Sequence, residues 1–367
     1  MTIHSAADTR IGQCGDPSTG ADSSAQAQQA AVRGYYGETL QSSTDLRTTA
    51  CCSIGAVPEQ IRSILAKVHP EVSERFYGCG SPLPPALEGM TVLDLGCGSG
   101  RDVYVLSSLV GEHGQVIGVD MTARQLEVAE RHRAFHAQAF GHAQSNVTFY
   151  LGDLANLDAL GIADASVDLV VSNCVLNLVP DKARAFAEIF RVLKPGGELY
   201  FSDVFSDRRL PRALLADPVL LGECLAGALY VEDFRRLLAT LGVADVRVCA
   251  RSPIALTDAA VEQRIGFAHF ESITWRAFRL PLEDRCEDYG QVATYLGTIP
   301  GHPHRFALDD HHLFDTGKPL CVCGNTADML ASTRYAPHFR IEGDQLRHYG
   351  LFGCAAAAPV SAAAACC

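Results

Sequence analysis

The segment VLDLGCGSGRD, residues 92–102, constrains the fold more than any other part of the chain. An apolar run that can form a buried strand leads into Gly96, Gly98 and Gly100, and a helical segment follows. Glycines let the backbone approach a ligand closely, and the first N–H groups of a helix point toward such a ligand. The segment therefore predicts the first strand, turn and helix of a nucleotide-binding fold.

Short apolar runs alternate with helical periods after this turn. The runs at 115–120, 146–153, 167–173 and 197–203 are predicted strands, and amphipathic segments lie between them. This alternation is typical of parallel strands joined by crossover helices, so we predict an α/β domain. The sequence Lys194-Pro195-Gly196-Gly197 should end the helix before the last strand.

Changes of composition along the chain predict five segments. They are a disordered arm at 1–30, a helical cap at 31–80, the α/β domain at 81–250, a small α+β domain at 251–350 and an alanine- and cysteine-rich tail at 351–367.

Charge and hydropathy narrow the class of function. The formal net charge of −12 argues against wide contact with nucleic acid, because clustered Lys and Arg supply such binding. No apolar run approaches the roughly 18 residues of a membrane helix, and the first residues lack the basic start and apolar core of a signal peptide. We therefore expect a cytoplasmic protein that acts on small molecules away from membranes, with a monomer as the default state.

Two acids at strand ends sharpen the nucleotide-site prediction. Asp94 lies just before the glycine turn, and Asp120 ends the next strand, where a carboxylate can accept both ribose hydroxyls. Charge-assisted bonds of this type contribute about 1.5–3 kcal/mol. The turn reads G-x-G-x-G and fits the dinucleotide pattern G-x-G-x-x-G poorly. A dinucleotide such as NAD, or a fold that has lost its ligand, remains the alternative.

These features resemble the class I S-adenosylmethionine-dependent methyltransferases, whose fold is Rossmann-like with a mostly parallel, seven-stranded sheet. The resemblance implies that Asp94 holds the methionine amino group, that Gly96 and Gly98 pass under the methionine moiety, and that Asp120 binds the ribose. It further implies a cofactor-binding set completed by Asp153 and Leu154 beside the adenine and by Arg101, Met121 and Asn173.

The chain has 14 cysteines, and four of them need individual explanations. Cys174 follows the predicted strand at 167–173, at the edge where the cofactor's methyl group would project. A buried structural cysteine is the alternative. Cys79 and Cys224 lie before the first strand and after the strand at 197–203, and Cys51 lies further upstream. Thiols without an obvious base suit a soft acceptor that carries its own lone pair, such as trivalent arsenic.

Seven motifs together resemble arsenite S-adenosylmethionine methyltransferases over about residues 45–250 and more loosely to about residue 350: DLRTTAC, RFYGCG, DLGCGSGRDVYVLS, VIGVDM, VSNCVLNLVPDK, GGELYFSDV and GECLAGALY. The resemblance implies that Cys174 and Cys224 bind the metalloid, that Cys79 supplies a third thiolate and that Cys51 pairs with Cys79 in a redox-active arrangement. Cys52 beside Cys51 leaves the identity of that partner open. Tyr77 is either an aromatic wall near the sulfonium or a packing residue.

The function implied is methyl transfer from S-adenosylmethionine to arsenite or its glutathione conjugate, with glutathione or thioredoxin as the external reductant. Two alternatives stay open: a carbon or oxygen methyltransferase for quinones or sterols, and a thiol-rich metalloid-binding protein without activity. We expect no metal besides arsenic, because neither the histidines of 302–312 nor Cys321 and Cys323 have the spacing of a zinc set. Cys354, Cys366 and Cys367 are either metalloid scavengers or part of an inert tail.

Overall fold

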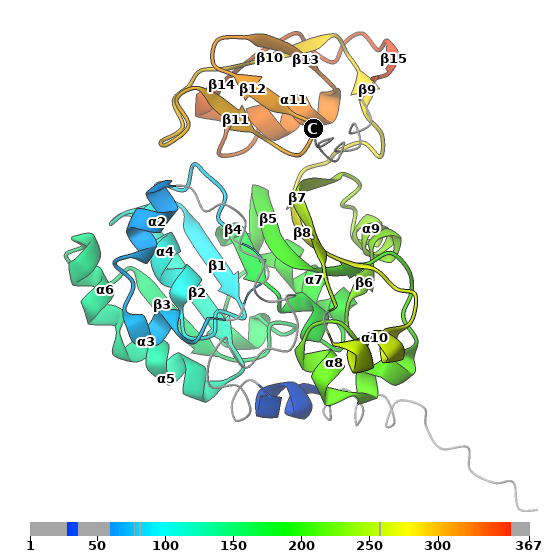
Figure 1. Cartoon of the computed structure of the whole chain (residues 1–367). Helices are drawn as coiled ribbons and strands as arrows, with labels where there is room; N and C mark the ends of the chain where they lie inside the picture. The colour runs from blue at the N-terminus through cyan, green and yellow to red at the C-terminus, as the bar shows by residue number, and fades with distance from the viewer. Residues whose placement is uncertain are drawn as a thin grey trace, which may run out of the picture.

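The computed structural model describes residues 28–35, 59–76, 78, 80, 82–256 and 258–353. Figure 1 shows a larger α/β unit with a smaller, later unit stacked on one end of it. The larger unit is built on strands β1 Thr91–Leu95, β2 Gln115–Asp120, β3 Val147–Leu151, β4 Val167–Asn173, β5 Leu193–Ser206, β6 Leu229–Tyr230, β7 Val246–Ile254 and β8 Phe270–Phe278.

These strands form one sheet in the order β3-β2-β1-β4-β5-β8-β7, and β6 pairs with β5 away from this path. The pairs among β1 to β6 are parallel, whereas β8 runs antiparallel to β5 and β7. The predicted, mostly parallel α/β sheet is thus confirmed, with eight strands instead of seven because of the two-residue β6. The chain order reverses between β1 and β4, so ligands are expected beyond the carboxyl ends of these two strands.

Helices cover both faces of the sheet (Figure 1). They are α2 Glu59–Leu65, α3 Pro70–Ser73, α4 Arg101–Val110, α5 Ala123–Arg131, α6 Arg133–Phe140, α7 Lys182–Val192, α8 Pro218–Gly222, α9 Val231–Thr240 and α10 Ala259–Ile265, with short 3-10 turns η3 Asp158–Leu160, η4 Leu176–Leu178 and η5 Arg212–Ala216.

The two faces of β1 show why the strand reads as a continuous apolar run. Val92 packs with Val103 of α4 on one face, and Leu93 packs with Phe186 of α7 on the other. Successive side chains of a strand point to opposite faces, and a strand covered by helices on both faces must be apolar throughout. Asp94 is the exception within β1, and it marks the site described below.

The last strands of this sheet correct the expected domain boundary and lengthen the predicted strand at 197–203. The predicted domain boundary at residue 250 falls inside β7, and the sheet continues to Phe278, because β7 and β8 form an antiparallel pair separated by α10. The Lys194–Gly197 segment does follow the end of α7, but it forms part of β5 as an irregularity of the β4–β5 pairing. Gly196 N donates to Arg279 O, and Arg279 N donates to Gly197 O. Pairing with residues distant in sequence therefore carries the segment into the strand.

The smaller unit has the predicted α+β composition. It contains β9 Glu287–Asp288, β10 Gln291–Tyr295, β11 Arg305–Ala307, β12 Leu313–Asp315, β13 Pro319–Val322, α11 Gly324–Ala331, η6 Ala336–His338, β14 Phe339–Glu342 and β15 Gly350–Leu351. Three small antiparallel sheets, β13-β10-β14, β11-β12 and β15-β9, organise it. Its core is aromatic, with Tyr295, Phe306, Phe314, Tyr335 and Phe339 in one cluster.

A buried charge cluster fastens the two units together. Glu198 on β5 has no exposed surface, and it pairs with Arg276 on β8, with 2.7 Å between Nε and Oε1, and with Arg334 of the smaller unit. Arg276 also donates to the Tyr335 hydroxyl at 2.8 Å and to the Leu308 carbonyl. Buried charges are costly unless paired, so this cluster fixes where the smaller unit docks.

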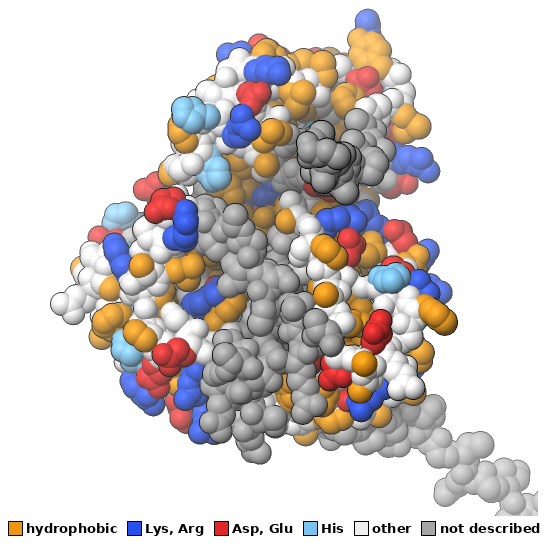
Figure 2. Space-filling model, in the orientation of Figure 1, with side chains coloured by type: hydrophobic (Ala, Val, Ile, Leu, Met, Phe, Trp, Pro, Cys, Tyr) orange, Lys and Arg blue, Asp and Glu red, His pale blue; other side chains and the backbone are white. Residues whose placement is uncertain are grey.

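The described part of the chain begins with a short helix, and the drawn face of its surface carries mixed charge. Residues 28–34 form a helix, so the predicted disordered arm at 1–30 is wrong for residues 28–30, and residues 1–27 lie outside the described part of the chain. In the described part of the face drawn in Figure 2, acidic and basic side chains are interspersed. Among the described residues, no helix has both the length and the apolar character needed to cross a bilayer.

Candidate functional site

The glycine turn after β1 forms the floor of the site. Gly96, Gly98 and Gly100 all have positive φ, at 74°, 53° and 87°, which side chains rarely tolerate. A Cβ at Gly96 would lie 2.3 Å from Val175 Cγ2, so the turn also needs glycine for space. The Gly96 N–H donates to Val119 O of β2 at 2.8 Å. The turn is thus held against β2 while its open side faces the cavity.

Asp120 at the end of β2 ties the turn to the next loop. One carboxylate oxygen accepts from Gly98 N at 2.9 Å, and the other accepts from Thr122 N at 2.8 Å. Burial raises the pKa of Asp120, and these backbone bonds oppose the rise. The carboxylate is therefore fixed in orientation at the rim of the cavity.

Two further acids, Asp94 and Asp102, lie near the start of α4. Arg101 donates to Asp102 Oδ1 at 2.9 and 2.7 Å, and its guanidinium lies 3.0 Å from the centre of the Phe76 ring. Asn173 at the end of β4 donates to Asp102 Oδ2 at 3.3 Å. Burial, followed by the charges of Asp102 and Asp120, raises the pKa of Asp94 well above its ordinary value.

One cavity brings these groups together. It is lined by every predicted cofactor-binding residue: Asp94, Gly96, Gly98, Arg101, Asp120, Met121, Asp153, Leu154 and Asn173. Asp102 and Arg75 also line it. The cavity therefore has four carboxyl groups but only two guanidinium groups, and one of these, that of Arg101, is already paired with Asp102. This excess of acidic groups suits a ligand that carries positive charge. A sulfonium with an amino group, as in S-adenosylmethionine, meets that requirement.

Two lining residues come from the region before the α/β domain, Gln29 from the predicted arm and Val32 from the predicted helical cap. Gln29 and Val32 belong to the helix at 28–34, and Val32 is buried. The Gln29 side chain donates to Asp153 Oδ2 at 2.9 Å. Tyr35 just after this helix donates to Glu223 at 3.0 Å. The helix therefore joins the cofactor side of the cavity to the α8 region. No local sequence pattern predicts this contact.

The structure brings Cys174 and Cys224 together. Cys174 lines the cavity, while Cys224 is fully buried behind it, and its Sγ donates to Cys174 O at 3.4 Å. Their sulfur atoms and a carboxylate oxygen of Asp203 all lie within 4.8 Å of one another. Both cysteines have positive φ, at 57° and 61°. Such backbone strain concentrates at functional sites.

The oxidation states of the two sulfurs differ. Cys174 is disulfide-bonded in the structure, whereas Cys224 is a thiol. The expected thiolate role of Cys174 therefore requires reduction first.

Sequence analysis missed the polar group beneath the thiols. Asp203 of β5 accepts from Asn177 N at 3.1 Å and from Asn177 Nδ2 at 2.7 Å. Burial raises the pKa of Asp203 to about 7, and burial lowers the pKa of nearby Lys182 to about 8. Lys182 donates to the carbonyls of Asn177 and Val179. Asp203 could have been found from the sequence, because it is the acid that ends the predicted strand at 197–203.

Several predicted residues lie outside the described part of the chain. They are Cys51, Cys52, Tyr77, Cys79, Cys354, Cys366 and Cys367. The expected third thiolate and the expected redox pair stay predictions.

The strand order, the glycine turn and the acid-lined cavity define the chain as a class I S-adenosylmethionine-dependent methyltransferase. Residues 86–242 match the family described as "Methyltransferase domain", and residues 289–362 match "Arsenite methyltransferase C-terminal domain". The chain is 53% identical to an arsenite methyltransferase of Aquipseudomonas alcaligenes over 92% of its own length and 99% of that relative. It is 43% identical to a human arsenite methyltransferase over 89% of its length and 86% of that relative.

A solved structure gives the same result. The chain is 55% identical to an arsenic(III) S-adenosylmethionine methyltransferase from Chlamydomonas reinhardtii, with a TM-score of 0.79 over 81% of this chain and all of that one. The chain therefore belongs to the arsenite methyltransferase family.

Proposed function

We propose that the protein transfers methyl groups from S-adenosylmethionine to trivalent arsenic held by cysteine thiolates, giving methylated arsenicals in a detoxification reaction. The observation that carries the proposal is the convergence of Cys174 and Cys224, 50 positions apart in sequence, to within 4.8 Å at the edge of the cofactor cavity. The named activities of the relatives support the same substrate.

The cofactor occupies the acid-lined cavity in this proposal. Asp94 takes the methionine amino group, Asp120 the ribose hydroxyls and Asp153 the adenine side, with Gly96 and Gly98 under the methionine moiety. A bound sulfonium would be within the same acid-lined cavity as Cys174, so the cavity could present its methyl group to a metalloid held there. Arg101 acts indirectly, because its pairing with Asp102 keeps that carboxylate in place.

The thiols hold the arsenic in a reactive geometry. Each thiol replaces one oxygen ligand of arsenite and releases water, and Cys79 is the proposed third ligand. Three sulfurs leave arsenic pyramidal, with its lone pair outward. That lone pair forms the bond to the methyl carbon while the carbon–sulfonium bond breaks, and the bonding pair returns to sulfur. Holding the reacting atoms about 3–3.5 Å apart is the main contribution available to the protein.

A thiol reductant is the proposed co-substrate. The disulfide at Cys174 supports this role, since thiol–disulfide exchange must release the sulfur before it can bind arsenic. Glutathione or thioredoxin would supply the two electrons, and a glutathione conjugate of arsenite would deliver arsenic by exchange of one thiolate for another. The expected Cys51–Cys79 pair would be regenerated by the same reductant.

The test is a transfer assay with S-adenosylmethionine labelled in its methyl group. We expect label in methylated arsenicals only when protein, arsenite and thiol are all present. Label transferred equally well to a quinone or sterol without arsenite would favour the carbon or oxygen methyltransferase. Arsenite binding without any transfer, under reducing conditions and with the cofactor bound, would contradict the proposed activity and favour a binding protein.

The Asp120→Asn variant should bind S-adenosylmethionine about 10- to 100-fold more weakly. The change removes a charge-assisted bond to ribose, worth about 1.5–3 kcal/mol. It also places an amide N–H opposite one of the two backbone N–H groups, of Gly98 and Thr122, that now donate to Asp120. Calorimetric titration with the cofactor measures the effect. Asp158→Asn, at an exposed acid of η3, is the matched control. Equal affinities for the two variants would remove Asp120 from the proposed site.

A further inference from the structure

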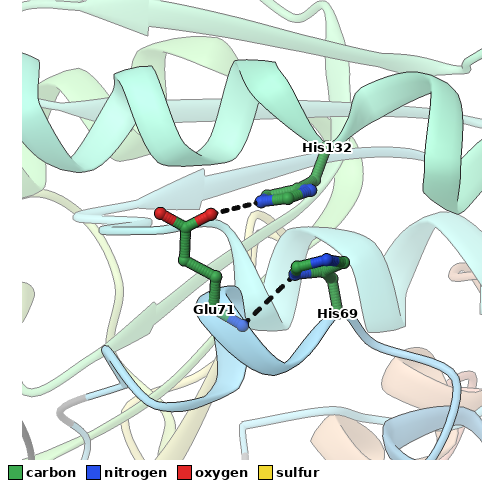
Figure 3. A group of neighbouring side chains, drawn as sticks. All are labelled: His69, Glu71 and His132. Carbon is green, nitrogen blue, oxygen red and sulfur yellow. Dashed lines mark hydrogen bonds and ion pairs between the residues drawn. The ribbon is translucent and has the colours of Figure 1, made fainter.

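Three potential metal ligands form a group separate from the one made by Cys174, Asp203 and Cys224. Figure 3 shows His69 and Glu71, at the start of α3, facing His132, which lies between α5 and α6. One ligand atom from each of the three lies within 4.8 Å of the other two. His132 is buried, whereas His69 and Glu71 are half-buried.

Existing bonds hold these three side chains close together. Glu71 Oε2 lies 2.7 Å from His132 Nε2, and the Glu71 N–H donates to His69 Nδ1 at 3.2 Å. The two imidazole rings stack with 3.7 Å between their centres and 21° between their planes. Two ring nitrogens and a carboxylate oxygen therefore already border one small space (Figure 3).

A fully buried histidine supports both imidazole residues from behind. His136 Nε2 accepts from the backbone N–H of His69 at 3.1 Å, so its Nδ1 carries the proton and donates to His132 O at 2.8 Å. Its ring stacks on Tyr104, with 3.5 Å between ring centres, and it is only 1% exposed. One rigid side chain thus fixes the backbones of both potential ligands, as outer-shell groups do at metal sites.

We propose that His69, Glu71 and His132 bind a divalent transition-metal ion of the Zn²⁺ class, with water completing the coordination. Two imidazole nitrogens and one carboxylate form a donor set suited to such ions, whereas Mg²⁺ and Ca²⁺ prefer oxygen alone. Ligands about 2.0–2.2 Å from a tetrahedral Zn²⁺ lie about 3.4 Å apart, so side-chain rotation of His69 out of the stack closes the site. The metal takes the place of the proton between His132 Nε2 and Glu71, and that proton moves to Nδ1.

Arg131 sets the strength of this site. Its guanidinium donates to Glu71 Oε1 at 2.8 Å and leaves Oε2 toward the histidines. The positive charge repels a bound cation, and its side chain is 59% exposed, so the effect is moderate. A metal site therefore predicts that removing this charge tightens binding, an effect that a purely structural cluster would not produce.

The position of the site gives the metal a structural role. The chain continues from α3 into Arg75 and Phe76, which line the cofactor cavity. Ser99 in the glycine turn donates to Val72 O of α3 at 2.9 Å. A metal that joins α3 to the α5–α6 junction would therefore hold the wall of the cavity, and we expect bound metal to raise the thermal unfolding midpoint.

The test is Co²⁺ titration of untagged, chelator-treated protein, followed by visible absorption. Co²⁺ bound by imidazole and carboxylate shows d–d bands without the intense near-ultraviolet band of cobalt–thiolate, which separates this site from the cysteines. We expect Glu71→Gln and His69→Gln to weaken binding at least 10-fold. Arg131→Gln should tighten binding about two- to ten-fold. Zn²⁺ should displace Co²⁺ with unit stoichiometry.

His113→Gln, at an exposed position beyond α4, is the matched control and should leave the titration unchanged. Two variants of the cluster are used so that a folding defect in one does not decide the outcome, and circular dichroism checks both. The proposal is overturned if millimolar Co²⁺ gives no thiolate-free spectrum, or if both cluster variants bind Co²⁺ as tightly as His113→Gln.

Discussion

Replacing Cys224 with serine is expected to lower the rate of arsenite methylation at least 100-fold while leaving the affinity for S-adenosylmethionine within about two-fold. Serine keeps the size of the side chain and tolerates φ of 61° as poorly as cysteine does, so the fold is preserved. Oxygen is a poor ligand for a soft centre, and arsenic would lose one of the contacts that position it. Cys224 is buried behind the cavity instead of lining it, so cofactor affinity should stay.

Cys174→Ser should give a similar loss of activity, with one added precaution. This change also removes a disulfide, so both variants and the unaltered protein are assayed in excess thiol, where the disulfide is reduced. Label transfer to arsenite and calorimetry with the cofactor are the two measurements. Cys321→Ser, at an exposed thiol of β13, is the control and should methylate arsenite normally.

A second readout follows the thiols directly. Arsenite should protect Cys174, which lines the cavity, from alkylation in reduced protein, and this protection should weaken in Cys224→Ser. If both serine variants methylate arsenite as fast as Cys321→Ser, the thiol pair is not the metalloid site. The activity of the family would then need another acceptor position.

Glu198→Gln is expected to destabilise the protein by about 3–5 kcal/mol, the cost typical of removing one partner from a buried ion pair. Glutamine keeps the shape of the side chain but leaves Arg276 and Arg334, whose side chains are 1% and 5% exposed, without their countercharge. Urea unfolding can be followed by the fluorescence of Trp275, the only tryptophan, which is fully buried beside Arg276. Its emission should shift at a lower urea concentration than in the unaltered protein.

Asp315→Asn provides the matched comparison for this change. Asp315 pairs with Arg305 at 3.9 Å on the surface, where ion pairs contribute about 0–1 kcal/mol. Both substitutions exchange a carboxylate for its amide, so only the burial differs. Equal unfolding midpoints for the two variants would show that the Glu198 cluster does not hold the smaller unit in place.

Local pattern was sufficient for the cofactor end of the cavity. Asp94 and Asp120 follow apolar runs that end at glycine or a turn, and the carboxyl ends of neighbouring parallel strands must share an edge. Asn173 and Cys174 follow the strand that the structure pairs directly with β1. These positions could be predicted because each depends on a short segment and on one rule of sheet topology.

Other parts of the site depend on pairings between distant segments. Gln29 reaches Asp153 across 124 positions, and nothing in the surrounding residues distinguishes this glutamine from its neighbours. The Lys194–Gly197 segment follows the end of α7 as predicted, but its backbone pairing with Arg279 also makes it part of β5, which was not predicted. Long-range hydrogen bonds decided both outcomes, and local propensity carries no information about them.

Strand β5 has a practical consequence for anyone who shortens this protein. Glu198, which holds the smaller unit, and Asp203, beside the paired sulfurs, lie five positions apart on this strand, or about 17 Å. A truncation that ends after the matched methyltransferase segment at residue 242 would discard β7, β8 and both arginines that neutralise Glu198. The strand would then become an open edge carrying an uncompensated acid. A loss of activity in such a fragment would therefore result from a damaged fold, and it would not show that the removed residues take part in catalysis.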